Sequence, residues 1–246
     1  MKSHFSDECL ADLIRALTTT HTEDLESFSD QFGFVTSNGE SKTKWDFIFA
    51  DICRAAQKDG LKCLNMDRSP LWGFVGVLSE DETQLLLFFN EKTLRKITNH
   101  FDDNPIHYLN ALLIRNKNVL GFEQQSLFRN PNMAEIQEKQ NEIVRSLLGQ
   151  YADKVDLVLT LSQTTSQGVP VSAQLELFDQ QGHLVETTDM SKYIDADYLD
   201  NASINQGSGT TSTIPRLKNS VKQSSLSNRS KVPQKNAHHG DNTEKN

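Results

Sequence analysis

The composition of the chain changes abruptly at about Asn201, and this change limits how much of the chain can fold. From there to Asn246 the residues are mainly Ser, Asn, Thr, Gln, Gly and Lys, with scattered single aliphatic residues and no aromatic residue. Such a segment cannot bury enough apolar area to offset the entropy of ordering its backbone. The sequence therefore predicts one folded domain at 1–200, followed by a disordered, Ser/Asn/Lys-rich tail at 201–246.

Helical periodicity accounts for much of the expected folded domain. Apolar residues recur at three- and four-residue spacing in five segments, and Ser6 and the pair Asn104–Pro105 resemble helix starts. Trp45 falls on one of these apolar stripes and is expected to be structural. The predicted helices cover about 7–17, 22–32, 44–58, 105–117 and 133–148.

The expected strands fall into two groups. A hairpin region near 61–90 contains three short β candidates, one of which begins near Trp72, a second residue expected to be structural. A period of two then predicts a three-stranded antiparallel meander near 155–187. Because helices and strands are grouped and do not alternate strictly, we predict an α+β fold with helices packed on antiparallel β units.

The cysteines and the apolar runs bear on the compartment. Cys9, Cys53 and Cys63 are an odd number without CxxC spacing, and each lies in or beside an apolar run, so we interpret them as buried thiols in a reducing cytosol. The longest purely apolar run, Leu85 to Phe89, is too short to cross a bilayer, and the N-terminus lacks the apolar core of a secretory signal. A cytoplasmic location and no membrane partner are therefore expected.

Charge is divided unevenly between the two parts of the chain. The tail carries seven of the 25 Lys and Arg residues but only two of the 33 Asp and Glu residues, which leaves the domain near −13 and the tail near +5. An acidic surface repels the phosphate backbone, so the balance argues against direct nucleic-acid binding by the folded domain unless a local basic patch overrides it. The partner class that this charge favours is another protein, in particular a basic or DNA-binding one.

The familiar sequence motifs of enzymes and cofactor sites are absent. The chain has no GxxxxGK[ST] phosphate loop, no GxGxxG dinucleotide pattern, no GxSxG nucleophile pattern, no HExxH and no Ca²⁺ loop. No cofactor is therefore expected. Enzymes that gather carboxylates and a lysine from separate strands, as nucleases do, would still escape such a search.

A cluster of imidazoles and carboxylates offers a candidate metal site. His100, Asp102, Asp103 and His107 lie within eight residues around an expected helix start, and these are ligands that a divalent ion can use. The alternative is structural: Asp102 and Asp103 would offset the positive end of the helix, and His107 would be a partly buried first-turn residue.

A second set of residues allows for catalysis by a metal-dependent nuclease. Asp67 at a strand end could hold a metal ion, with Glu91 and Lys92 as partners on a neighbouring strand and His107 as a further candidate. Because Glu91 and Lys92 are adjacent, they would point to opposite faces of a strand, which weakens the hypothesis. The alternative is a turn in which Arg68 forms a surface ion pair.

Four stretches follow one another as an aromatic helix, an Arg and a Trp before a strand, a second strand, and an HYxxAL helix. They are Trp45 to Ile48, Asp67 to Trp72, Leu86 to Lys92 and His107 to Leu112. Over about 45–128 this pattern resembles a family of uncharacterised proteins from Gram-positive bacteria and their mobile elements. That family has no assigned activity, so the resemblance implies a bacterial or phage setting and no reaction.

Two functional hypotheses remain open from the sequence. The leading one is a protein-interaction or regulatory module of the bacterial or phage cytosol, because the domain has the elements of a complete fold while the catalytic signals are weak. The alternative is a metal-dependent nuclease or another nucleic-acid-processing enzyme. Convergence of the candidate residues in one concave pocket would favour the enzyme.

Overall fold

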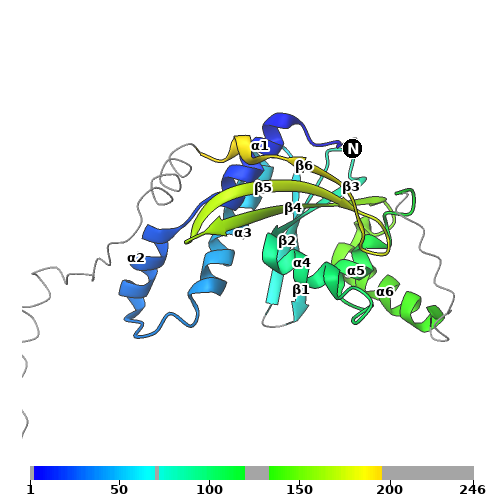
Figure 1. The fold of residues 1–246 in the computed structure, drawn as a ribbon, viewed down its shortest axis with the longest axis horizontal. Helices are drawn as coiled ribbons and strands as arrows, with labels where there is room; N and C mark the ends of the chain where they lie inside the picture. The colour runs from blue at the N-terminus through cyan, green and yellow to red at the C-terminus, as the bar shows by residue number, and fades with distance from the viewer. Residues whose placement is uncertain (1–2, 70–71, 120–132, 196–246) are drawn as a thin grey trace, which may run out of the picture. The chain divides into compact units, whose positions relative to one another are not determined.

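The computed structural model describes residues 3–69, 72–119 and 133–195 (Figure 1). All of them belong to one compact unit, Met1–Gly207. The tail expected at 201–246 lies outside the described residues. Within the described ranges, no helix combines the length and the apolar character that crossing a bilayer requires.

Six strands form one sheet whose spatial order follows the chain. All neighbours pair antiparallel except β3 and β4, which are parallel and run from Gln84↔Leu157 to Asn90↔Gln163. This parallel pair joins the expected hairpin region to the expected meander, so the predicted α+β fold is confirmed and its two β units form one sheet. The strands are β1 (Lys62–Ser69), β2 (Trp72–Leu78), β3 (Gln84–Asn90), β4 (Leu157–Ser166), β5 (Val169–Phe178) and β6 (Leu184–Asp189).

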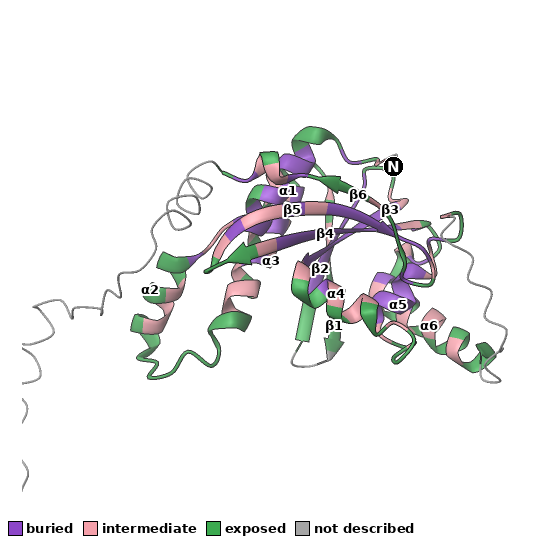
Figure 2. Cartoon of the chain, in the orientation of Figure 1, coloured by how far each residue is buried: buried purple, intermediate pink, exposed green. Residues whose placement is uncertain are grey.

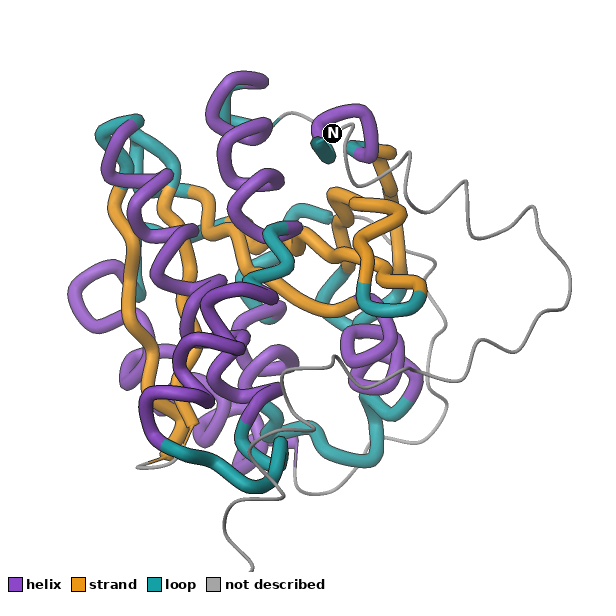
Figure 3. Tube along the Cα trace, turned by 90° about the vertical axis from the view of Figure 1, so that its left-hand side faces the viewer, coloured by secondary structure: helices purple, strands orange, loops and turns teal. Residues whose placement is uncertain are grey.

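Helices cover both faces of the sheet (Figures 1 and 3). One core cluster lies between the sheet and the pair α1 (Asp7–Thr18) and α3 (Glu40–Lys58). A second cluster lies between the opposite face and three later helices. These are α4 (Glu91–Asn99), α5 (Tyr108–Leu113) and α6 (Met133–Leu148). The remaining elements are α2 (Thr22–Phe32) and the short 3₁₀ helices η1 (Gly149–Tyr151) and η2 (Ser191–Tyr193).

Strand β3 is a central strand of the sheet, and its apolar run contributes to the cores on both faces. Leu86 and Phe88 belong to the core under α1 and α3, whereas Leu85, Leu87 and Phe89 belong to the core on the other face. Because both faces are covered, the strand has no polar side to alternate with, which explains its unbroken apolar run.

The helix starts agree with the sequence in part. The Ser6 hydroxyl accepts a hydrogen bond from the Cys9 N–H at 3.1 Å and begins α1 as expected. The start expected at Asn104–Pro105 is wrong, because α5 begins only at Tyr108, after an N-cap at His107. Helix α4 was not among the expected helices; the Asn90 side chain begins it by accepting from the Lys92 N–H at 3.1 Å.

Two apolar features are more exposed than the sequence suggests. Helix α2 has no buried residue (Figure 2), although its aromatic side chains share one side. Trp72 is 44% exposed, so its expected structural role is wrong. The reason lies in the sheet: β2 pairs with β3 only from Gly76 to Leu78, and the start of β2 therefore extends past its neighbour.

The interpretation of all three cysteines as free thiols is also wrong. Cys53 on α3 and Cys63 on β1 form a disulfide, with their Cα atoms 5.3 Å apart, and Cys9 alone stays a buried free thiol. The short connection through Asp59 and Gly60 turns the chain back, which brings α3 beside β1 within the Cα distance that a disulfide requires.

Candidate functional site: a pocket with cations and an exposed tryptophan

The structure separates the residues of the candidate metal site. His100 and His107 line one pocket, but neither Asp102 nor Asp103 lines it. Asp103 instead bonds His100 at its Nδ1 atom over 2.7 Å on the exposed surface. Among the described residues, no group of three or more His, Cys, Asp and Glu side chains is arranged to hold a metal ion.

The candidate nuclease residues also lie in different surroundings. Asp67 is on β1 and pairs with Gly73 of β2. Glu91 opens α4 and accepts a hydrogen bond at 2.6 Å from the Thr164 hydroxyl on β4. Lys92 follows in the first turn of α4, and none of the three lines the pocket that contains His107.

The pocket has a volume of about 360 Å³ and is formed by several segments. The end of β1 and the start of β2 form one side, while α4, the segment after it and the start of α5 form the rest. Its lining residues are Arg68, Trp72, Thr93, Lys96, Ile97, His100, Asn104, His107, Tyr108 and Asn110.

Arg68 and Lys96 give this pocket a positive charge. Among the residues that the structure describes, no carboxylate lines it, although the chain as a whole carries a formal net charge of −8. The Arg68 guanidinium carbon lies 5.4 Å from the centre of the Tyr108 ring, in a cation–π contact. Neither cation forms an ion pair with any residue in the described ranges, so the surface ion pair expected for Arg68 is not found.

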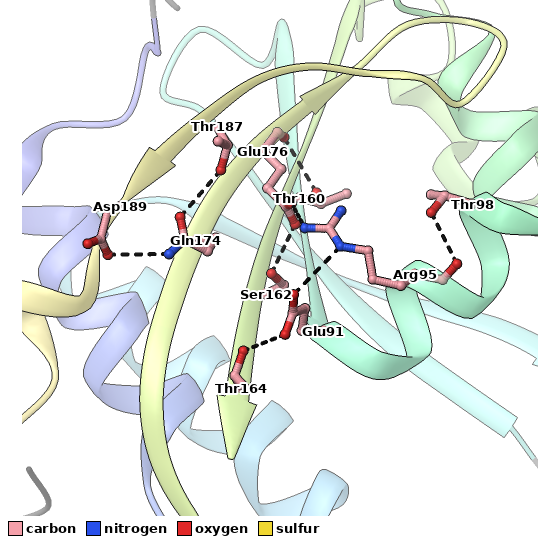
Figure 4. A network of polar contacts seen from close by, with 10 residues as sticks. All are labelled: Glu91, Arg95, Thr98, Thr160, Ser162, Thr164, Gln174, Glu176, Thr187 and Asp189. Atoms are coloured by element: carbon pink, nitrogen blue, oxygen red, sulfur yellow. Dashed lines mark hydrogen bonds and ion pairs between the residues drawn. The ribbon is translucent and has the colours of Figure 1, made fainter. Parts of the chain in front are cut away.

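The neighbouring cation on α4, Arg95, is used inside the fold (Figure 4). Its guanidinium forms an ion pair with Glu176 of β5, whose side chain is fully buried, and Ser162 donates to the same carboxylate at 2.9 Å. Arg95 also lies 3.7 Å from a Glu91 oxygen. Arg95 therefore stabilises the packing of α4 on the sheet, while Lys96, one residue further, faces the pocket.

His107 is held as a neutral hydrogen-bond donor. Burial, assisted by the positive charge of Arg68, lowers the pKa of His107 to about 4. Its Nδ1 atom accepts from the Leu109 N–H at 3.2 Å, so the single proton of the neutral ring is on Nε2. His107 thus combines an N-cap role with a free N–H group.

Two aromatic residues of the pocket differ in what they offer. Tyr108 is packed against Phe74 and His107, with ring centres 4.5 and 4.4 Å away, and burial raises the pKa of its hydroxyl. It serves as a wall and as the support of Arg68. The Trp72 ring, in contrast, remains largely open to a ligand.

Asn110, which lines the pocket, has a buried hydrogen-bond acceptor without a partner among the described residues. Its side chain is 1% exposed, and its Nδ2 donates to the carbonyl oxygens of Phe101 at 2.8 Å and Asn104 at 2.9 Å. These two bonds fix which end of the amide carries the nitrogen. The Oδ1 atom has no partner within the described part of the chain, which is uncommon for a buried polar group.

The sequence indicated only parts of this pocket. His100 and His107 belong to the candidate metal site predicted from the sequence, and Arg68 and Trp72 lie in one of the stretches that carry the family resemblance, whereas Lys96 belongs to no predicted site. The pocket depends on the close approach of α4 and the end of the β1–β2 hairpin, which local patterns do not report. The sequence feature that points to the pocket is the pair Arg68 and Trp72, close together at a turn.

A family model described as a family of unknown function, DUF5986, matches residues 2–234. The match covers nearly the whole chain and continues into the tail expected from the sequence. No curated protein and no solved structure matches the chain.

Proposed function

The chain belongs to this family of unknown function, and from the pocket we propose that the protein binds a small anionic ligand. The observation behind this proposal is that two cations, Arg68 and Lys96, line one pocket, and that within the described part of the chain neither has an ion-pair partner and no carboxylate joins them in the lining. We also propose that the protein acts in a bacterial or phage cytosol, because its sequence over about 45–128 resembles a family from Gram-positive bacteria and their mobile elements.

The charge distribution supports binding of an anion. Among the described residues, Lys58, Lys62 and Lys154 form ion pairs with carboxylates, whereas Arg68 and Lys96 do not. Other described cations, such as Lys92 and Lys117, are also without an ion pair, but Arg68 and Lys96 differ from these two because both line the same cavity. Unneutralised cations in a partly enclosed site attract an anion more strongly than cations on an open surface.

The same distribution favours a small ligand over a polymer. A nucleic acid would extend past the pocket and meet an acidic surface, which repels its phosphates. A small anion would contact only the pocket. Because the described lining of the pocket contains no carboxylate, the site is also better suited to holding an anion than to binding the metal ion of a nuclease.

Calorimetry with pyrophosphate tests this proposal directly. The full-length protein should bind pyrophosphate, with an affinity that falls as salt rises, and Arg68→Gln together with Lys96→Gln should remove the binding. Lys139→Gln is a matched control, because Lys139 lies on α6 and pairs with Glu135. Unchanged affinity in the double variant would show that the anion binds elsewhere.

A second candidate function, protein interaction, is favoured by the surface around α2. Phe32 and Phe34 are more than half exposed and Val35 is 97% exposed. They lie beside a cavity of about 840 Å³ between α2 and the start of α3, to which Glu26 and Glu40 contribute. We propose a basic, amphipathic segment of a partner protein as the occupant, because it would match both the apolar and the acidic character.

Peptide binding tests this second candidate. A Lys-rich amphipathic helical peptide should bind the full-length protein, and a peptide with each Lys replaced by Glu should not. Phe34→Ser together with Val35→Ser should abolish the binding without lowering stability, since both side chains are exposed. Equal binding of the two peptides would contradict the proposed charge preference.

A further inference from the structure

We infer that the ligand of the pocket is a mononucleotide, whose phosphate contacts Arg68 and Lys96 and whose base stacks on Trp72. This inference rests on the proposed anion-binding function and adds the chemical class of the ligand. Each of its two parts comes from a separate observation on the lining residues.

The exposed indole is the first observation beyond charge. Trp72 begins β2 at the pocket, beyond the part of the strand that β3 covers, and an inorganic anion would leave its ring unused. A large aromatic side chain open to solvent beside cations is the usual platform for a nucleobase, because every base has a flat π-face. A ligand with a planar, apolar ring and an anionic group would match Trp72 and the cations beside it.

The remaining polar group complements the phosphate side. His107 is neutral with its proton on Nε2, so it donates to an anion without adding a charge of its own. Arg68 is supported over the Tyr108 ring, and its planar guanidinium can bond two phosphate oxygens at once. Arg68, Lys96 and His107 thus form a donor set for one phosphate group.

The size of the cavity limits the ligand. Ligand pockets in proteins range over roughly 300 to 1,000 Å³, and about 360 Å³ lies near the lower end. This volume suits one base, one sugar and a phosphate, and leaves no space for a dinucleotide cofactor. It also agrees with the absence of the GxGxxG pattern from the sequence.

Titration calorimetry on the full-length protein tests the inference with AMP, GMP, CMP, UMP and ribose 5-phosphate. At least one nucleotide should bind at least about tenfold more tightly than ribose 5-phosphate, since stacking on an aromatic side chain adds this much or more. If ribose 5-phosphate binds as tightly as every nucleotide, the inference is overturned while the anion-binding function stands. If no probe binds, pyrophosphate included, both fail.

A protein variant separates the base from the phosphate. Trp72→Ala should weaken nucleotide binding by at least about tenfold and leave ribose 5-phosphate binding within about twofold. Trp72 is exposed, so its replacement should not prevent folding. Leu184→Ala is the matched control, because Leu184 is an apolar residue of similar exposure that lines neither cavity. Equal weakening of both ligands would mean that Trp72 shapes the pocket and does not stack on a base.

Discussion

Asn116 exchanges two hydrogen bonds with the backbone of Val158: its Oδ1 accepts from the Val158 N–H at 2.6 Å, and its Nδ2 donates to the Val158 carbonyl at 2.9 Å. The same Nδ2 donates to the Phe178 carbonyl at 2.7 Å. The ladder between β4 and β5 begins only at Leu159↔Leu177. A side chain therefore replaces the backbone pairing where the two strands separate.

Substitution of Asn116 should destabilise the fold. Asn116→Ala leaves one buried N–H and two buried carbonyls without this partner, and an unsatisfied buried group costs roughly 1 to 3 kcal/mol. We expect a loss of about 2 to 4 kcal/mol in the free energy of unfolding, measured by urea denaturation. Asn118→Ala is the matched control, because Asn118 is exposed. A loss below about 0.5 kcal/mol for Asn116→Ala would contradict this role.

The ion pair between Arg95 and Glu176 should show strong coupling. Arg95→Met leaves a fully buried carboxylate without its cation, and breaking a buried pair in this way costs roughly 3 to 5 kcal/mol. Arg95→Met with Glu176→Met removes both charges and should recover most of that loss. A double variant as unstable as the sum of its single variants would show that the two residues act independently.

Reduction should weaken the region that contains Cys53 and Cys63. The disulfide closes a short loop, and such a bond restricts the unfolded chain by about 2 to 3 kcal/mol. We expect dithiothreitol to lower the melting temperature of the protein by several degrees, and to have no such effect on a Cys53→Ser, Cys63→Ser variant. Identical melting with and without reductant would exclude a stabilising bond.

The disulfide also makes the expected cytoplasmic location testable. Disulfides persist mainly in oxidising compartments and are uncommon in a reducing cytosol. Cells can be quenched with an alkylating reagent before lysis, and the modification of Cys53 and Cys63 read by mass spectrometry. Alkylated thiols are the expected result for a cytoplasmic protein. An intact disulfide in quenched cells would favour another compartment.

His107 should make folding sensitive to acid. Its pKa of about 4 lies below the ordinary value of 6.5, so between these pH values the unfolded chain binds a proton that the folded chain does not. The contribution of His107 to stability is therefore complete above about pH 6.5 and is lost as the pH falls towards 4.

Two measurements check this expectation. The imidazole resonances of His107 should titrate near pH 4 in nuclear magnetic resonance spectra, assigned by their disappearance in His107→Asn. That variant keeps an N-cap acceptor and should lose less stability than the natural protein between pH 6.5 and 4. A midpoint near 6.5 would contradict the burial argument.

Local patterns predict local elements of this protein well. Strand β3, Gln84–Asn90, lies in the hairpin region predicted near 61–90, because its apolar run is continuous in the sequence. The cap at Ser6 is correct for the same reason. The parallel pairing of β3 with β4 and the disulfide depend on which distant segments approach each other, and no periodicity encodes that approach.

The candidate site was predictable only in fragments. His100 and His107 were identified from their proximity in the sequence, and both line the pocket. Asp102 and Asp103 were grouped with them for the same reason, yet Asp103 faces outward to an exposed imidazole. Arg68 and Lys96 line the same pocket only because the end of β1 lies across from α4. The sequence alone therefore does not reveal their shared role.

The parallel contact between β3 and β4 has a consequence for the order of folding. Strands β1 to β3, and separately β4 to β6, join neighbours along the chain and can form early as local hairpins. Pairing of these halves closes a long loop from Asn90 to Leu157. The conformational entropy of this loop is lost before the strand pairing contributes any stabilisation. Docking of the two halves should therefore be the slow, rate-determining event, most sensitive to changes in Leu86 and Leu159.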